Sequence, residues 1–200
     1  MKRIVSVLTI LCLLLGSMLL FTACGDEEKT DPVKVILTVK DFGEITLELY
    51  PEHAPITVKN FLKLVDEKFY DGLTFHRIYK GFMIQGGDPK GDGTGDSGET
   101  IKGEFSANGV ENTLSHTRGT VSMARGSYSM DSASCQFFIC DADSPFLDGQ
   151  YAAFGKVIAG MDVVDAIADV EVSANVFGEM SVPNQTVTIE SIRRVENATK

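Results

Sequence analysis

Apolar residues recur at every second position in much of this chain, and no other feature limits its possible folds as strongly. The segments 33–39 and 45–49 place Val, Leu or Ile at alternate positions. Side chains of a β-strand point in turn to the two faces of its sheet, so this pattern predicts strands with one buried face. Residues 41–44, Asp-Phe-Gly-Glu, lie between the two segments as a turn. The pair is therefore predicted to form a β-hairpin.

Further short strands with glycine-rich turns follow this hairpin, and two helical segments interrupt them. A helix is predicted over 56–69 and a shorter one over 161–168, because apolar residues there recur at helical spacing. Many short strands are typical of a barrel or a sandwich. We predict a mainly β fold, a closed eight-stranded antiparallel β-barrel capped by two α-helices. Its remaining strands are expected at 74–78, 83–86, 119–123, 136–140, 154–158 and 186–193.

The N-terminal segment has the layout of an export signal. Lys2 and Arg3 precede an apolar stretch that runs from Ile4 to Phe21. The next residues, Thr-Ala-Cys at 22–24, resemble the lipoprotein box of bacteria, and this resemblance implies cleavage before Cys24 and diacylglyceryl transfer to its thiol. Two acyl chains hold a protein stably on a bilayer. We therefore expect an extracytoplasmic protein that is lipid-anchored to the cell membrane.

Two other interpretations of this segment remain open. An uncleaved helix needs ~20 apolar residues to cross a bilayer, and the stretch has about that length. An ordinary cleaved signal peptide would instead leave a secreted protein. Under the lipoprotein interpretation, 1–23 is the signal peptide, 24–32 holds the lipidated cysteine and a flexible acidic tether, and 33–196 is the folded domain. A tether of this length reaches at most ~30 Å, which would keep the domain near the lipid surface.

Net charge and cysteine content indicate whether the chain binds nucleic acid and whether it forms a disulfide. The formal net charge is −10 and no basic cluster follows Lys2-Arg3, which argues against nucleic acid because phosphates require a basic patch. Cys135 and Cys140 are five positions apart in a predicted strand and should point to opposite faces. A disulfide between them would require the strand to break. Both are predicted to be buried free thiols.

Five sequence blocks between residues 75 and 157 carry a family resemblance that covers about residues 33–195. They are FHRIYKGFMIQGGD at 75–88, SMAR at 122–125, SCQFFI at 134–139, LDG at 147–149 and FGKV at 154–157. Occurring in this order, they resemble the cyclophilins, which are peptidyl-prolyl cis–trans isomerases. The resemblance implies a cyclophilin-like barrel and makes 33–196 an isomerase domain. Its expected substrates are proline-containing polypeptides, here exported proteins that are folding.

The chemistry of prolyl isomerisation explains which residues such a site needs. Twisting the X–Pro C–N bond destroys resonance worth ~18–20 kcal/mol, and the uncatalysed step takes ~10–100 s. In the twisted state the proline nitrogen becomes pyramidal and its lone pair can accept a hydrogen bond. A cationic donor that binds this state better than the planar one accelerates the reaction. Nothing in this scheme requires a nucleophile, a metal or a cofactor, and none is expected.

The resemblance assigns roles to named residues. Arg77 is the implied donor, since its guanidinium stays charged and presents a rigid set of N–H groups. Taken alone, such an arginine would more often be a surface residue paired with a carboxylate, and the apolar residues would be ordinary core. The implied catalytic residues are Arg77, Gln85, Phe82 and Phe138. The implied substrate-binding residues are Met83, Ala124, Arg125, Gly126, Gln136, Phe146, Leu147 and Tyr151.

Three of these residues depart from the common family pattern. Phe146 stands where many cyclophilins have Trp, and it lacks the indole N–H that contributes to cyclosporin binding, so sensitivity to that drug stays open. Tyr151 replaces a frequent His and keeps an aromatic wall with a polar tip. Arg125 replaces a frequent Asn, and Met-Ala-Arg at 123–125 resembles the bacterial branch of the family.

Other apparent motifs are set aside on their spacing. The glycine-rich segment 86–98 contains aspartates four apart, which does not match the alternation of an EF-hand loop, and no metal site is expected there. The histidines form no metal-binding pair at helical spacing and stand near no nucleophile elbow. His76 is predicted to point away from its neighbour Arg77 on the same strand. His53 and His116 receive no role.

Three functions compete at this stage. The first is a membrane-tethered monomeric prolyl isomerase that acts on exported proteins. The second is a cyclophilin-like binding or chaperone lipoprotein in which catalysis is incidental. The third, a solute-binding lipoprotein, would need a ligand cleft between two lobes, and a chain of 200 residues is short for that design. We expect the first.

Overall fold

The computed structural model describes residues 31–195, which form ten strands and two α-helices. The signal peptide, Cys24 and most of the tether lie outside the described residues. Within 31–195, no helix combines the length and the apolar character needed for a membrane crossing. The α-helices are α2 (Pro55–Asp66) and α3 (Met161–Ala168). The strands are β1 (Val33–Val39), β2 (Gly43–Leu49), β3 (Thr74–Tyr79), β4 (Met83–Asp88), β5 (Thr120–Met123), β6 (Phe137–Cys140), β7 (Ala153–Ala159), β8 (Val172–Ala174), β9 (Met180–Pro183) and β10 (Ile189–Arg194).

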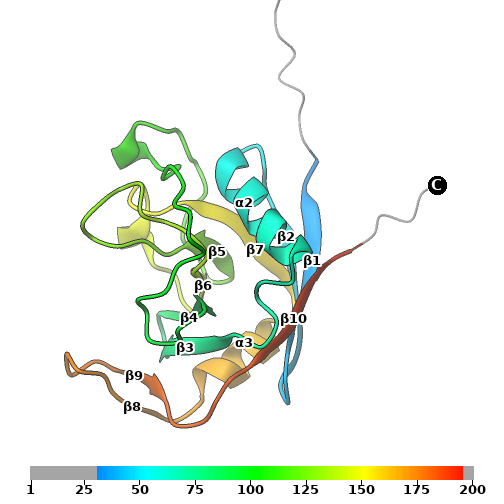
Figure 1. The fold of residues 1–200 in the computed structure, drawn as a ribbon, viewed down its shortest axis with the longest axis vertical. Coiled ribbons are helices and arrows are strands. Elements are labelled where there is room, and N and C mark those ends of the chain that lie inside the picture. Colours follow the sequence, from blue (N-terminus) through cyan, green and yellow to red (C-terminus); the bar gives the residue numbers. More distant parts are fainter. Residues whose placement is uncertain (1–30, 196–200) are drawn as a thin grey trace, which may run out of the picture.

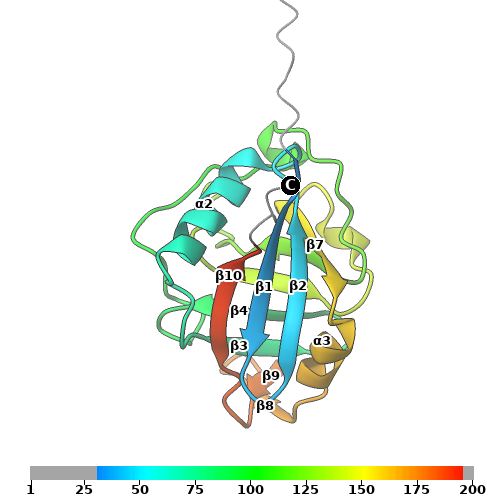
Figure 2. The same ribbon diagram turned by 90° about the vertical axis from the view of Figure 1, so that its right-hand side faces the viewer.

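Eight of the strands form one antiparallel sheet in the order β10-β1-β2-β7-β5-β6-β4-β3. All eight correspond to strands that the sequence predicts. In the first hairpin, Val33 pairs with Leu49 and Val39 with Gly43. The sheet curls around the core (Figures 1 and 2). Helix α2 packs beside β10, and α3 lies on the other side of the β1–β2 hairpin, against β2 and β4. The prediction of a mainly β fold with two helices is confirmed.

The prediction of a closed barrel is wrong. β10 and β3 are the two end strands, and no ladder joins them. Thr188, just before β10, makes one isolated bridge with Thr74. Three backbone hydrogen bonds flank the bridge, from the N–H groups of Phe75, Ile189 and Gly72 to the carbonyls of Val187, Leu73 and Ile189 (2.9, 2.8 and 2.8 Å). The sheet is therefore an open, curled half-barrel. Alternation specifies which face of each strand is buried, whereas closure depends on the tilt and stagger of the first strand against the last.

Helix α2 covers the core, and a buried carboxylate caps its first turn. Its apolar side, which includes Val58, Phe61 and Val65, is buried as the spacing predicts. The N-cap residue Ala54 provides no side-chain acceptor. Instead the Glu104 carboxylate accepts hydrogen bonds from the Ile56 and Thr57 N–H groups (3.0 and 2.7 Å). At this end of a helix, carboxylate oxygens satisfy N–H groups that have no partner within the helix, and their negative charge interacts favourably with the positive end of the helix dipole.

The helix ends earlier than the predicted residue 69. Glu67 is its C-cap, and Lys68 follows with a positive φ of 57°, which interrupts the helical backbone. Phe69 therefore lies beyond the helix, where it still packs against the core edge-on to Tyr70. Helical spacing alone does not reveal such a stop.

The two cysteines behave as predicted. Cys135 and Cys140 are both buried and free. Cys135 packs in the main core, whereas Cys140 belongs to a separate small cluster with Met83, Phe138 and Leu147. Burial raises the pKa of the Cys135 thiol to about 11 and that of Cys140 to about 12. Both thiols are consequently protonated at neutral pH.

The sequence did not predict the small hairpin formed by β8 and β9. It pairs Val172 with Pro183 and stands beside β3 at the end of the molecule (Figure 1). Val176 and Phe177 at its turn are exposed by 93% and 91%. Because its strands are short and these side chains are in solvent, the segment has no alternation of apolar and polar residues that would indicate a hairpin.

Candidate functional site

A cavity of about 120 Å³, lined by both apolar and polar side chains, lies where β3, β4, β5 and β6 meet the loop before β7. Every residue that lines it was assigned to the site from the sequence. Met83, Phe138 and Leu147 are buried and form an apolar cluster within its lining. The lining residues are Arg77, Phe82, Met83, Gln85, Ala124, Arg125, Phe138, Leu147 and Tyr151.

The pleat of β6 separates core from cavity. Phe137 is fully buried and packs edge-on against Phe61 (5.5 Å between ring centroids). Its neighbour Phe138 faces the cavity and packs edge-on against Tyr151 (6.0 Å). Successive side chains of a strand point to opposite faces, and the structure places this pair as that rule predicts.

A directional chain of hydrogen bonds orients the polar side of the cavity. Gln136 donates through Nε2 to the Gly93 and Gly95 carbonyls (3.1 and 2.8 Å), which fixes its amide so that Oε1 faces Gln85. Gln85 then donates to that oxygen (2.9 Å) and accepts through its own Oε1 from Nη1 of Arg77 (3.2 Å). Because backbone carbonyls only accept, the whole chain has one consistent direction.

Arg77 also makes a bidentate ion pair with Glu179, a residue that the sequence analysis missed. Its Nε donates to Oε1 (2.7 Å) and its Nη2 to Oε2 (2.8 Å). These hydrogen bonds lower the pKa of Glu179 to about 2, so the carboxylate is ionised at neutral pH. Glu179 lies 102 positions from Arg77 in the turn of the β8–β9 hairpin, outside all five sequence blocks, and no local signal marks it.

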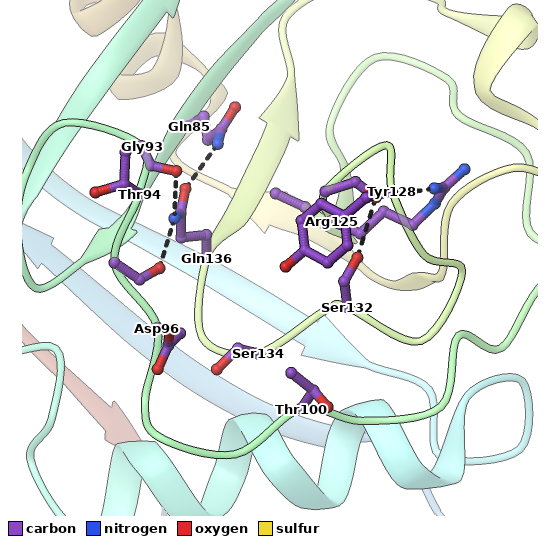
Figure 3. Close-up of a pocket in the computed structure, with 13 residues that line it drawn as sticks. Gln85, Gly93, Thr94, Asp96, Thr100, Arg125, Tyr128, Ser132, Ser134 and Gln136 are labelled. Carbon is purple, nitrogen blue, oxygen red and sulfur yellow. Dashed lines mark hydrogen bonds between the residues drawn. The ribbon is translucent and has the colours of Figure 1, made fainter.

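A second and larger cavity, of about 400 Å³, adjoins the first. Gln85, Ala124 and Arg125 line both, while Gly126 and Gln136 line only the larger one. Figure 3 shows Gln136 with Gly93 and Thr94 on one side of it, facing Arg125, Tyr128 and Ser132 on the other. The predicted substrate-binding residues are thus divided between two adjoining cavities.

Phe146 is the one predicted site residue that lines neither of these two cavities. Its side chain is 68% exposed and packs against Phe82 (5.4 Å between centroids). It therefore extends the apolar surface outward from the smaller cavity. A 3-10 turn, Pro145–Leu147, turns Leu147 into the cavity and leaves Phe146 outside.

A β-bulge corrects the expectation for His76. Phe75 pairs with Gly86 and Arg77 with Gln85, which leaves His76 as the extra residue on β3. His76 and Arg77 consequently line the same third cavity, of about 720 Å³, beneath the β8–β9 hairpin. Burial lowers the pKa of His76. Simple alternation would have placed these two side chains on opposite faces.

His116, which received no role from the sequence, lies behind the apolar wall. It is 1% exposed and stacks on Phe138 (6.0 Å, 17° between planes). Its Nδ1 lies 2.8 Å from Asp148 Oδ1, and its Nε2 lies 2.9 Å from the hydroxyl of Ser122. The carboxylate can only accept, so Nδ1 donates and Nε2 accepts. Since Ser122 is fully buried, this Ser-His-Asp array supports the wall and cannot act as a nucleophile.

The glycine-rich segment owes its shape to a buried aspartate. Asp88 is 1% exposed and accepts hydrogen bonds from the N–H groups of Lys90, Asp92 and Gly93 (2.8, 3.2 and 2.6 Å). These bonds hold the loop so that the Gly93 and Gly95 carbonyls reach Gln136. The aspartate thereby supports the polar side of the site.

Comparison with known proteins agrees with this geometry. Residues 34–194 match the family model "Cyclophilin type peptidyl-prolyl cis-trans isomerase/CLD". Peptidyl-prolyl cis-trans isomerase B of Bacillus subtilis is 44% identical over 69% of this chain and 92% of its own length. A peptidyl-prolyl cis-trans isomerase of Acinetobacter baylyi is 47% identical over 76% of this chain and 81% of its own length. Fungal isomerases match as well.

A solved structure shows the same fold. It is a Cryptosporidium parvum cyclophilin type peptidyl-prolyl cis-trans isomerase, crystallised in the presence of the dipeptide Ala-Pro. The two superpose with a TM-score of 0.71 at 30% identity, over 82% of this chain and 99% of that one. The match of family model, relatives and fold covers nearly the whole described chain. On this evidence the chain belongs to the cyclophilin-type peptidyl-prolyl cis–trans isomerases.

Proposed function

We propose that this isomerase acts on X–Pro bonds of exported proteins at the membrane surface, and that Arg77 donates a hydrogen bond to the nitrogen of the twisted amide. The observation that carries the proposal is that Arg77 lines the small cavity together with Phe82, Met83 and Phe138. The proline ring would enter this cavity. Burying its three methylenes contributes about 2 kcal/mol at ~0.8 kcal/mol each.

The size of the required barrier reduction shows how much the Arg77 hydrogen bond can contribute and how much must come from other contacts. Bringing an uncatalysed step of ~10–100 s to milliseconds requires about four to five decades, or ~5.5–7 kcal/mol. One hydrogen bond to a charged group contributes ~1.5–3 kcal/mol. The remainder must come from contacts that favour the twisted peptide, since equal binding of planar and twisted forms accelerates nothing. Met83, Phe138 and Leu147 hold the ring, and the chain through Gln85 holds the donor.

The cellular setting rests on the N-terminal sequence. We infer that the signal directs export, that lipid on Cys24 anchors the domain, and that it acts there as a monomer of the bacterial branch. Mass spectrometry of the mature N-terminus is expected to find two acyl chains on Cys24. A free thiol or a retained signal peptide would contradict the lipid anchor and would leave the proposed isomerase activity unaffected.

The catalytic proposal is tested by isomerisation of a proline-containing peptide. A chain that starts at Asp31 retains every core residue that the structure describes. Arg77→Ala is expected to lower kcat/KM about 10- to 100-fold, the equivalent of one charged hydrogen bond. Arg193→Ala is the matched control, because Arg193 makes a similar bidentate pair with Asp71 (2.8 and 2.6 Å) away from the cavity. A wild type no faster than Arg77→Ala would end the proposal.

One observation favours the alternative of a binding or chaperone lipoprotein. Tyr128, Phe146 and Phe177 are strongly exposed, and each belongs to or borders a cavity of the site. Exposed apolar surface of this kind can hold unfolded chains. Under this alternative, Arg77→Ala lowers isomerisation and leaves the cellular phenotype of the wild type intact. Loss of the phenotype in parallel with catalysis supports the enzyme.

A further inference from the structure

The β8–β9 hairpin holds Glu179 in a defined place beside β3. The Asn175 N–H donates to the Glu179 carbonyl (2.8 Å), and the Glu179 N–H donates to Oδ1 of Asn175 (3.0 Å). The same Oδ1 accepts from the Phe177 N–H (2.9 Å). The turn therefore has an internal support. The hairpin lies beside β3 (Figure 1), and the Glu179 carboxylate accepts hydrogen bonds from Arg77 on that strand.

The donors of Arg77 can be counted one by one. A guanidinium has five N–H groups. Glu179 accepts from Nε and from Nη2, and Gln85 accepts from Nη1. Nη1 also donates to Sδ of Met83 (3.9 Å), which is a weak acceptor. This leaves one N–H on Nη2 for a substrate at the small cavity, which Arg77 lines. The plane of the guanidinium is thus held at two of its edges, by residues from β4 and from the hairpin.

We propose that Glu179 is a positioning residue of the isomerase, which holds the Arg77 guanidinium in the orientation that presents its remaining Nη2 N–H to the twisted prolyl amide. The proposal rests on the role given to Arg77 above. A free arginine side chain has ~2 kcal/mol of rotamer entropy to lose on ordering. When a carboxylate imposes that order before the substrate arrives, the donor needs no rearrangement in the transition state.

The opposite role makes a distinct prediction. If Glu179 sequesters Arg77, its removal frees the guanidinium and raises kcat. If Glu179 positions Arg77, its removal lowers kcat and leaves KM nearly unchanged, because the planar ground state makes little use of the donor. The direction of the change in kcat separates the two roles.

The test measures kcat and KM separately on the full chain in mild detergent, with a proline-containing peptide. Glu179→Ala is expected to lower kcat about tenfold with KM within twofold, and Glu179→Gln, which keeps one acceptor oxygen, is expected to lower it less. Glu190→Gln, which neutralises an exposed carboxylate on β10, is the matched control and should behave as wild type. An unchanged or raised kcat, or a change confined to KM, overturns the proposal.

A double variant shows whether Glu179 acts through Arg77. In the Arg77→Ala background, Glu179→Ala is expected to change kcat less than twofold, since residues that act as one unit are not additive. A further tenfold loss in that background overturns the proposal. If Arg77→Ala alone behaves as wild type, the proposed role of Arg77 fails; if only the Glu179 variants do, this inference alone fails.

A measurement without substrate completes the test. The Arg77 Nε–H donates to a carboxylate in the wild type, so its NMR signal is expected to exchange slowly with water. In Glu179→Gln that exchange should accelerate several-fold, while thermal unfolding stays close to that of the wild type. Equal exchange in the two proteins overturns the positioning role, and the Gln variant keeps the test available if the Ala variant does not fold.

Discussion

The two phenylalanines of β6 are chemically identical and have different neighbours. Phe137 packs against Phe61, Tyr70 and Phe75 in the main core (5.5, 5.6 and 6.1 Å between centroids). Phe138 contacts His116 and Tyr151 around the small cavity. At the scale of single residues, two adjacent side chains therefore have different roles: Phe137 contributes to stability and Phe138 to activity.

Truncating each of the two rings should separate these effects. Phe137→Ala is expected to lower the free energy of unfolding by about 3–5 kcal/mol, as for a buried aromatic, while the folded fraction keeps its kcat/KM. Phe138→Ala is expected to lower kcat/KM at least tenfold with a smaller loss of stability, because it removes a wall of the cavity. Urea unfolding and peptide isomerisation measure the two quantities. Equal losses of activity in both variants would contradict this division.

The first turn of α2 depends on a residue 47 positions away in the chain. Glu104 is 2% exposed, and its carboxylate also accepts from the Thr57 hydroxyl (2.6 Å). At the scale of elements, this carboxylate joins the helix to the loop before β5. A helix whose own N-cap has no acceptor is stable here because another segment provides one.

Removing that acceptor should destabilise the domain without altering the site. Glu104→Ala leaves the Ile56 and Thr57 N–H groups without their partner, and the expected loss is about 2–3 kcal/mol of unfolding free energy. Glu111→Ala, at an exposed position in the same loop, should change stability by less than about 0.5 kcal/mol. Urea titrations of both variants test this, and a loss for Glu104→Ala no larger than that of the control would refute it.

At the scale of the whole molecule, several titratable groups favour one charge state on folding. Burial lowers the pKa values of His76 and His116 below 6.5, so folding favours their neutral forms. Hydrogen bonds from Arg194 and Arg193 lower the pKa values of Asp66 and Asp71 below 3.8. In both cases the unfolded chain binds protons more readily than the folded one, and acid must destabilise the fold.

The pH dependence of unfolding should therefore have two stages. The histidine contribution is complete above about pH 6.5 and is lost as the pH falls below that value. The carboxylate contribution is complete above about pH 4–5 and is lost at lower pH. Thermal melts between pH 8 and 3 are expected to show a first decline of Tm below neutrality and a steeper one below about pH 4. A Tm that is constant or rising from pH 7 to 5 would contradict the histidine part.

The extent of sequence-based prediction follows the range of the interactions. The eight strands of the main sheet and both helices were found because alternation and helical spacing are local. The β8–β9 hairpin was missed because its strands are short and its turn is in solvent. All residues of the small cavity except Tyr151 lie in the five sequence blocks. Glu179 and His116 received no role from the sequence, and they join the site through contacts with Arg77 and Asp148, which are distant in the chain.

The sequence by itself determined which faces of the strands are buried and that Phe137 and Phe138 point to opposite faces of their strand. It also identified Arg77 and the apolar residues of the site. Only the tertiary structure decided three other features. These are the open edge between β10 and β3, the bulge that brings His76 and Arg77 into one cavity, and the carboxylate that binds the arginine. Periodicity records the steric alternation of neighbouring residues. Strand stagger, bulges and ion pairs arise where segments far apart in the chain meet, and their geometry is set by packing.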